Sequence, residues 1–397
     1  MNKLTKVTIP KLATSSECTG CMGCINACSH DVLSAQYDND GFLCIDVKNP
    51  SKCVACGLCS KSCPVISEPK KRNKYVNCYA AWNDDSIQRA ASASGGVFSA
   101  LASKILDGGG VVYGAAIEGF SVVHIRVSDL KDLNRIQGTK YQLSDTTCIY
   151  KQVRQDLVKG LTVLFSGMSC QVAALFNYLG NINTDKLYTV DTICGGYSTM
   201  LPMNELQKHG GYKGIYSFRD KQNGWKSRGF KYNLRMRRLD GTIEDLGDSN
   251  LVIKSFSSIL MKQSSCLACK FNGVVRLSDI TIGDYWQDEN NPSQHNAGLS
   301  CVVTHNDKGE AIIHASKLSV RPTSIQSIGK GNSNLYWSQY RGIRHLISRK
   351  IAMCLLRNKK YNLYRRIISY SGLLSLEWRL YLRYNNKLRI RAFKDIK

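Results

Sequence analysis

No stretch of this sequence approaches the run of about 18 apolar residues that a membrane-spanning helix needs. Residues 1–10 also lack an apolar core of the length found in a signal peptide. Nothing in the sequence therefore predicts export to an oxidising compartment, where disulfides form. We expect a cytoplasmic protein whose thiols are reduced and available as ligands.

Acidic residues are scarce, because 30 Asp and Glu stand against 54 Lys and Arg. The shortage is greatest in residues 341–397, where only Glu377 and Asp395 oppose sixteen basic residues. Apolar residues recur there with helical spacing, at Ile343, Leu346, Ile347, Ile351 and Leu355. The pattern predicts a basic amphipathic helix that lies on an anionic membrane surface or docks on an acidic partner. Packing of the helix on the protein's own core is the alternative.

The net charge of +24 also raises the question of a nucleic-acid partner. Such binding needs aromatic and basic residues on a recognisable module, and the tail matches no such motif. We therefore expect no nucleic-acid partner, and peripheral membrane contact through the tail remains the interpretation of the charge.

Cysteine, by contrast, is abundant, with 17 residues. Residues 18–28 and 53–63 share the spacing C-x2-C-x2-C-x3-C, which wraps three thiolates around one 4Fe-4S cube and sends the fourth to the neighbouring cube. The two runs therefore predict a pair of interlocked clusters. One cluster is assigned to Cys18, Cys21, Cys24 and Cys63, and the other to Cys53, Cys56, Cys59 and Cys28.

Structural zinc and a disulfide framework are the alternatives. Zinc sites take four ligands from two separated CxxC pairs, not two interlocked sets of four, and disulfides would require export. Gly20, Gly23 and Gly57 favour the clusters, because backbone that packs close to a cluster and offers N–H groups to its sulfurs has little room for a Cβ.

The chain divides into four predicted regions. Residues 1–66 form the two-cluster domain, with a hairpin signal at Asn39-Asp-Gly41, and residues 67–75 form a polar linker. Strand and helix patterns alternate in residues 76–330, including a hairpin at Asp240-Gly241 and a helix over residues 310–318. Residues 331–397 form the basic helical tail. We expect an α/β core with a mixed sheet and flanking helices, preceded by a small α+β ferredoxin domain of the bacterial two-cluster type.

The core offers a glycine-rich turn where α/β sites usually lie, after a strand and before a helix. The turn is Ser94-Gly95-Gly96, which can present N–H groups and a helix N-terminus to the phosphates of a dinucleotide or flavin. A plain structural turn is the alternative.

Four further cysteines follow core strands or form a CxxC pair, namely Cys170, Cys194, Cys266 and Cys269. Thiols that leave adjacent parallel strands can converge, and a CxxC pair can close a four-thiolate cage for a third 4Fe-4S cluster. A redox-active CxxC is the alternative. We interpret Cys78, Cys148, Cys301 and Cys354 as small buried apolar residues.

The order of motifs over about residues 76–320 resembles the beta subunit family of deazaflavin (coenzyme F420) hydrogenases and dehydrogenases. The motifs are Ser94-Gly95-Gly96-Val-Phe-Ser, Gly138-Thr-Lys140-Tyr141-Gln-Leu-Ser144, Leu164-Phe-Ser-Gly-Met-Ser-Cys170-Gln171, Cys194-Gly195, Phe218-Arg219-Asp-Lys221, Gly224-Trp225, Cys266 to Cys269 and Asp279-Ile-Thr-Ile-Gly283-Asp284-Tyr-Trp286. A two-cluster domain also precedes the core in members of this family, including bacterial ones found with polysaccharide-building enzymes.

The resemblance implies an iron-sulfur oxidoreductase that binds FAD. It carries over Ser94, Gly95, Gly96, Lys140 and Tyr141 as flavin contacts and expects the core cluster at the four cysteines above. A flavin converts single-electron transfer into hydride transfer, so it fits with clusters on the same chain. The family more often has Gly-Thr-Pro before the first of these cysteines, so the departure here concerns the turn and not the ligand.

Two functions follow from these expectations. The first is a flavin-dependent reductase, fed by a ferredoxin-like donor through the amino-terminal clusters, that acts on a small organic substrate or deazaflavin. The second is a non-catalytic electron-transfer subunit of a larger dehydrogenase or hydrogenase. No residue identifies the substrate or a proton donor; Tyr141, Asp284, His124 and His295 are the candidates for the donor.

Overall fold

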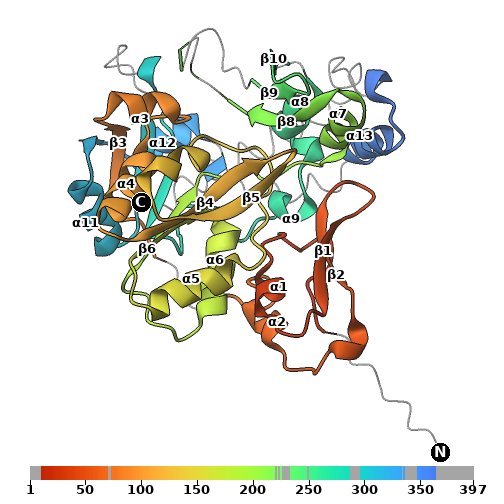
Figure 1. Cartoon of the computed structure of the whole chain (residues 1–397), viewed down its shortest axis with the longest axis horizontal. Helices are drawn as coiled ribbons and strands as arrows, with labels where there is room; N and C mark the ends of the chain where they lie inside the picture. Colours follow the sequence, from red (N-terminus) through yellow and green to blue (C-terminus); the bar gives the residue numbers. More distant parts are fainter. Residues whose placement is uncertain are drawn as a thin grey trace, which may run out of the picture.

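The computed structural model describes residues 10–69, 73–219, 221, 224–225, 233–247, 250–286, 296–332, 334–335 and 347–363. Within these residues, eight strands form one mixed sheet in the order β13-β3-β12-β11-β7-β6-β4-β5. The expected α/β core is thus confirmed (Figure 1). Its strands are β3 (Cys78–Asn83), β4 (Val111–Glu118), β5 (Ser121–Val127), β6 (Val163–Gly167), β7 (Leu187–Thr192), β11 (Ile280–Asp284), β12 (Ser300–Thr304) and β13 (Leu318–Pro322).

The centre of the sheet is parallel, because β4 pairs with β6, β6 with β7, and β7 with β11 in that sense. The strand β12 is antiparallel to both β11 and β3, so β3 runs in the same direction as the parallel strands. The carboxyl ends of β3, β4, β6, β7 and β11 therefore lie on one edge of the sheet. Ligands of open α/β sheets usually bind at this edge.

Helices cover both faces, because side chains of alternate strand residues point to opposite sides. One face packs under α3 (Ser86–Ala91), α4 (Val97–Asp107), η2 (Leu130–Arg135) and α11 (Asp307–Ala315), with Val112 and Leu164 among its buried residues. The other face packs under α5 (Ile149–Val158), α6 (Ser169–Leu179) and α12 (Ile325–Gly331), with Tyr113 and Phe165 buried beneath α5 and α6.

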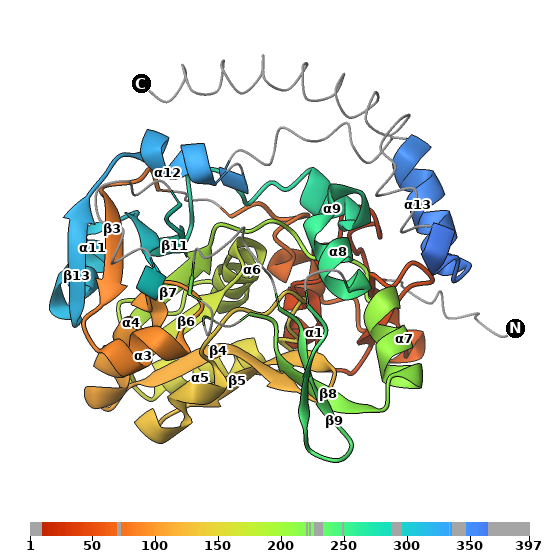
Figure 2. The ribbon, with the colours of Figure 1, turned by 90° about the horizontal axis from the view of Figure 1, so that it is seen from above.

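A second sheet projects from the core as an antiparallel hairpin with one further strand (Figure 2). It contains β8 (Tyr212–Ser217), β9 (Arg235–Arg238) and β10 (Ile243–Asp245). The hairpin predicted at Asp240-Gly241 is confirmed, because Gly241 lies between β9 and β10 with φ 90°. Helices α7 (Leu201–His209), α8 (Leu251–Ser257), η3 (Ile259–Met261) and α9 (Ser264–Leu267) complete this side of the molecule.

The amino-terminal region folds as a small α+β unit against α5 and α6 (Figure 1). It contains α1 (Gly23–Ala27), β1 (Leu33–Tyr37), β2 (Leu43–Val47), η1 (Pro50–Lys52) and α2 (Leu58–Ser62). The strands β1 and β2 form the hairpin predicted around Gly41. The Gly41 carbonyl accepts a hydrogen bond from Met200 N–H at 2.9 Å, which links this hairpin to the start of α7.

Several sequence expectations were wrong. The helix expected over residues 310–318 ends at Ala315, and Leu318 begins β13, which pairs with β3. Cys148 and Cys354 are exposed, whereas Cys78 and Cys301 are buried as expected.

No helix in the described residues is long and apolar enough to cross a membrane.

Part of the predicted tail, residues 331–397, is described, including helix α13 (Ile347–Arg357), which lies beside α7 and η3 (Figure 2). Its buried residues are Arg349, Ala352, Met353 and Leu356. Ile347 and Ile351 were expected on the apolar face but are exposed at 68% and 45%. The helix packs on the protein through a different face, and the exposed Ile347 and Ile351 leave the predicted contact with a membrane or an acidic partner untested. Residues 341–346 and 364–397 lie outside the described residues.

Candidate functional site

The two cysteine runs have the same backbone conformation although their sequences differ. Gly20 and Ala55, each one residue before the second cysteine of its run, have φ 66° and 54°. Met22 and Gly57, each one residue after that cysteine, have φ 58° and 71°. Left-handed backbone at these four positions folds each run into the same tight turn. The amino-terminal region is thus an internal repeat, with α1 and α2 as equivalent helices.

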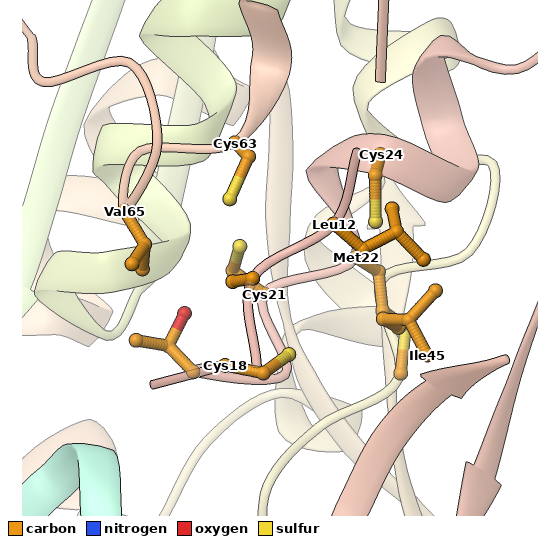
Figure 3. A pocket seen from close by; sticks show the side chains of 10 residues that line it. Leu12, Cys18, Cys21, Met22, Cys24, Ile45, Cys63 and Val65 are labelled. Atoms are coloured by element: carbon orange, nitrogen blue, oxygen red, sulfur yellow. The ribbon is translucent and has the colours of Figure 1, made fainter. Parts of the chain in front are cut away.

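The first predicted thiol set comes together in the structure. Cys18, Cys21, Cys24 and Cys63 line one small cavity, in which the thiols of Cys21 and Cys63 point toward each other (Figure 3). Gly20 N–H donates a hydrogen bond to Cys18 Sγ at 3.4 Å. Backbone N–H groups aimed at sulfur are typical of iron-sulfur sites, where they tune the cluster.

The second predicted set is more exposed than the first. Cys28, Cys53 and Cys59 pack around buried Leu33. Cys56 is exposed. Burial raises the pKa of the Cys59 thiol, and the nearby charge of Cys56 raises it further. The two sets therefore differ in exposure: the first is covered by the core, and the second reaches the surface.

The three glycines of the runs are accounted for in two ways, by close packing and by backbone conformation. A Cβ on Gly20 would lie 2.5 Å from Leu143, and one on Gly23 would lie 2.7 Å from the Ser62 carbonyl oxygen in α2. No atom of the described residues lies within 4 Å of a Cβ placed on Gly57, whose positive φ favours glycine. Packing of the protein against itself, as much as room for a cluster, accounts for the first two.

The four core cysteines also come together. Cys170 begins α6 after β6, Cys194 follows the adjacent parallel strand β7, and Cys266 and Cys269 come from α9 and the turn beyond it. Burial raises the pKa of Cys170, and the charges of Cys21, Cys269, Cys194 and Cys266 raise it further. The core set therefore lies next to Cys21 of the first amino-terminal set.

The chemistry of these donors fits a cluster. Burial raises the pKa of Cys21 and of Cys266 to about 12, so both thiols are neutral until a metal displaces the proton. Gly196 N–H donates to Cys194 Sγ at 3.2 Å, and Phe271 N–H donates to Cys269 Sγ at 3.4 Å. Within the described parts of the chain, no three or more His, Cys, Asp or Glu side chains form a group that could hold a metal ion. In a 4Fe-4S cluster each of the four thiolates binds a different iron atom of the cube.

Sequence analysis missed the polar residues around the core thiols. Lys262 is 3% exposed; its Nζ donates to the Gly196 carbonyl oxygen at 3.1 Å and lies 3.7 Å from the ring centre of Phe256. Burial lowers the pKa of Lys262 to about 8, against the opposing effects of Cys266 and Cys194. A single lysine outside a motif has no sequence signal that could have found it.

Arg276 is a second missed cation, 1% exposed and paired with Asp191 at 3.3 Å. Tyr197 is a missed aromatic residue, which packs with Cys266 and with Met22 of the first run. The Tyr197 hydroxyl is buried and has no hydrogen-bond partner among the described residues. These residues lie where the amino-terminal region meets the core.

The Ser94-Gly95-Gly96 turn lies at the carboxyl edge, at the N-terminus of α4. A Cβ on Gly95 would lie 2.4 Å from the Ala81 carbonyl oxygen and 2.7 Å from Ser300 N. Gly95 N–H already donates to Ser300 Oγ at 3.0 Å, and Gly96 has φ 84°. The two glycines therefore have a packing role of their own, independent of any bound phosphate.

A cavity of about 570 Å³ borders this turn. It is lined by Trp82, Asn83, Asp84, Ser86, Arg89, Ala90, Lys221, Asn296 and Ala297. Lys221 joins the two features, because its Nζ donates to the Ser94 carbonyl oxygen at 2.8 Å and to that of Ala297 at 3.0 Å. Burial lowers the pKa of Lys221 to about 7, and Arg89 and Arg219 lower it further. The positive lining suits an anionic ligand.

The Lys140-Tyr141 segment lies near the same turn. Lys140 Nζ donates to the Gln137 carbonyl oxygen at 2.6 Å, and the Gln137 amide donates to Ser99 Oγ of α4 at 3.1 Å. Burial lowers the pKa of Lys140 to about 7. The Tyr141 ring packs on Phe256, with ring centres 4.2 Å apart, so much of this side chain belongs to an apolar cluster.

His124 and Asp284, two of the candidate proton donors, already have partners within the protein. His124 is buried and stacks on Phe165 with ring centres 5.3 Å apart, and its Nε2 lies 2.8 Å from the Ser166 carbonyl oxygen. Burial lowers the pKa of His124 to about 4, so the ring is neutral. Asp284 pairs with Arg219 at 2.9 Å, and His295 lies outside the described residues.

Comparison with known families and structures gives three findings. Residues 17–66 match the family described as 4Fe-4S dicluster domain, and residues 160–324 match the family described as the C terminus of the beta subunit of coenzyme F420 hydrogenase/dehydrogenase. A chain of the F420-reducing NiFe hydrogenase complex from Methanosarcina barkeri is similar in structure, with 18% identity and a TM-score of 0.46 over 69% of this chain and 92% of that one. A search of curated protein sequences finds no match.

Proposed function

We propose that this chain, in which a 4Fe-4S dicluster domain precedes a domain of the coenzyme F420 hydrogenase/dehydrogenase beta subunit family, is an iron-sulfur flavoprotein oxidoreductase. It takes low-potential electrons from a ferredoxin-like donor and delivers them to FAD and then to an organic substrate or deazaflavin coenzyme. The observation that carries the proposal is the packing of the first cysteine run on α6, the helix that bears Cys170: Cys21 is buried with Val172 and Ala174 of that helix.

The proposed ligands of the dicluster domain are the two interlocked sets. Cys18, Cys21, Cys24 and Cys63 hold the inner cluster, and Cys53, Cys56, Cys59 and Cys28 hold the outer one. The matching backbone of the two runs supports this assignment, because equal turns place equal thiols around each cube.

Cys170, Cys194, Cys266 and Cys269 are proposed to hold a third 4Fe-4S cluster. The two N–H groups that point at Cys194 and Cys269 support this site. Buried Lys262 and Arg276 would offset the negative charge that a cluster with four thiolates brings into the core.

FAD is proposed to lie at the carboxyl edge, in the positive cavity beside Ser94-Gly95-Gly96. The flavin would supply the conversion between single electrons and a hydride. Arg89 and Lys221 would attract its phosphates, and Lys140, held near α4 by Gln137, would stabilise negative charge on a reduced ring. Tyr141, which follows Lys140, is proposed as a further contact of the flavin.

Anaerobically reconstituted protein tests the proposal. We expect twelve iron atoms per chain, four for each cluster, and one bound FAD that dithionite bleaches. Cys266→Ser should lose about four irons and keep the dicluster domain, which is built entirely from residues before Ser67. Cys56→Ser should keep FAD but lose its reduction by ferredoxin.

Lys140→Met tests the flavin site without disturbing the glycine turn and should weaken FAD binding, whereas Lys104→Met, exposed on α4, should not. Turnover is measured with coenzyme F420 and, separately, with glycan precursors. The comparison distinguishes a deazaflavin acceptor from an organic substrate. Protein that carries its clusters but takes up no FAD would overturn the proposal of an enzyme and favour a non-catalytic electron-transfer subunit.

A further inference from the structure

Two large apolar side chains are exposed beside the outer thiol set. Val54 is 59% exposed and Leu58 is 45% exposed, and Cys56 between them is also at the surface. Apolar side chains that cluster on the surface of a soluble protein often mark a site of interaction. We call Val54, Ala55, Cys56 and Leu58 the outer face.

The internal repeat shows what the corresponding surface does in the first run. Thr19, at the position equivalent to Val54, is 7% exposed, and Met22, equivalent to Gly57, is 1% exposed. This inner surface is covered by the core: a Cβ on Gly23, equivalent to Leu58, would lie 3.1 Å from Ala174 of α6. One copy of the repeated surface is therefore an interface already, and the other copy is open.

The outer face has a basic rim. Lys11, Lys48, Lys52 and Lys61 are exposed, and residues 47–67 contain no Asp or Glu. Ser60 Oγ donates to the Lys11 carbonyl oxygen at 2.8 Å, which places residue 11 beside α2. The acidic residues that border this range are Asp46 of the hairpin and Glu68, which is exposed and pairs with Lys270 at 3.3 Å. An apolar centre with a positive rim is complementary to an acidic protein.

We propose that the outer face is the docking surface of an acidic electron-carrier protein. This inference rests on the proposed function, because it takes the outer thiols as cluster ligands. In the docked pair the carrier loses one electron and the outer cluster gains it. Small apolar contacts with a charged rim give weak, transient complexes whose association is steered by charge.

The double variant Lys52→Glu/Lys61→Glu tests the surface. The electron donor is an acidic 4Fe-4S ferredoxin, reduced and freed of excess reductant, and the rate of cluster bleaching is followed at low ionic strength. We expect at least a tenfold lower second-order rate constant, because two charge reversals replace attraction by repulsion. The control variant is Lys104→Glu/Lys159→Glu, which changes two exposed lysines of the α/β domain. Its clusters should be reduced at the same rate as those of the parent chain.

Two further measurements separate a loss of docking from a loss of clusters in the double variant. Iron content and bleaching by dithionite should be unchanged in the double variant, because neither lysine is a proposed ligand. In the parent chain the rate with ferredoxin should fall steeply between low and physiological salt. A salt-independent rate, or an unchanged rate in the double variant, would overturn the docking surface.

The outer face could instead join two copies of this chain. In that case the parent would be a dimer, the double variant a monomer, and ferredoxin reduction unaffected, which also overturns the proposal. Failure of the proposed function is a different result: dithionite would bleach the clusters of the parent chain, and no FAD would be bound or reduced.

Discussion

The hydroxyl of Tyr150 donates a hydrogen bond to the main-chain carbonyl oxygen of Cys21 at 2.8 Å. Thr146 Oγ1 donates to the same oxygen at 3.0 Å, and Tyr150 N–H donates to Asn26 Oδ1 at 3.0 Å. Residues of the core thus complete the hydrogen bonding of the first cysteine run. The dicluster domain is held by specific polar contacts at the point where electrons are proposed to leave it.

Tyr150→Phe should lower the free energy of unfolding by about 1 kcal/mol, because one donor to a buried carbonyl is lost while Thr146 remains. Chemical denaturation of the anaerobic protein measures this change. Tyr178→Phe is the matched control, since Tyr178 has no side-chain hydrogen bond in the described residues and should be neutral. Equal stability of both variants would show that the bond contributes nothing.

Gly95→Ala should destabilise the fold by more than about 2 kcal/mol, because its Cβ would meet the Ala81 carbonyl oxygen at 2.4 Å. Gly109→Ala, at φ 72° in open space, should cost only about 1–2 kcal/mol from backbone strain. Thermal denaturation compares the two. A Gly95→Ala chain as stable as the Gly109→Ala chain would contradict the packing seen here.

Lys262→Met should lower the midpoint potential of the proposed core cluster by tens of millivolts, because a buried positive charge beside two thiolates favours the reduced state. Electron paramagnetic resonance during a redox titration measures the shift. Iron content and the potentials of the dicluster domain should not change. Lys270→Met, half-exposed and paired with Glu68, is the control. An unaltered core potential would rule out this role of Lys262.

Buried His124 should make the protein sensitive to acid. Its pKa is lowered from 6.5 to about 4 by burial, so between these values the unfolded chain binds more protons than the folded one. Its contribution is therefore complete above pH 6.5 and is lost as the pH falls toward 4, by up to about 3 kcal/mol. His124→Phe should show a smaller loss of stability than the parent chain between these two pH values. Parallel pH profiles of the two chains would refute this.

Truncation after Leu363 should leave the fold intact and, if the tail meets a membrane, remove binding to anionic liposomes at low salt. Truncation before Ile347 should instead cost roughly 3–6 kcal/mol, because Met353 and Leu356 are buried against Met22 and Phe42. Liposome flotation and thermal denaturation of the two chains test this. Undiminished flotation of the first chain would exclude the membrane contact.

The sequence predicted what depends on local spacing. The cysteine runs, the hairpin at Gly41 and the strands before Cys170 and Cys194 are set by patterns within a few residues, and the structure contains each of them. The convergence of Cys170 and Cys194 also followed from local information, because adjacent parallel strands end at the same edge.

Residues that act through distant partners left no such pattern. Lys262 becomes significant only because the segment before α9 contacts Gly196 in the segment after β7, and Tyr197 only because the dicluster domain packs over it. The buried face of α13 left no local pattern for the same reason. Ile347 and Ile351 have helical spacing and high hydropathy, yet the position of η3 and the first run decides that Ala352 and Met353 point inward.

Met22 and Met353 pack in one apolar cluster although almost the whole chain separates them. A ribosome therefore releases the cysteine runs long before it synthesises the helix that closes over them. Local turns around the thiols can form at once, but the joint between the dicluster domain and the core is completed only after α13 has been synthesised. Cluster insertion has this interval in which to occur, while the inner thiols are still open to the solvent.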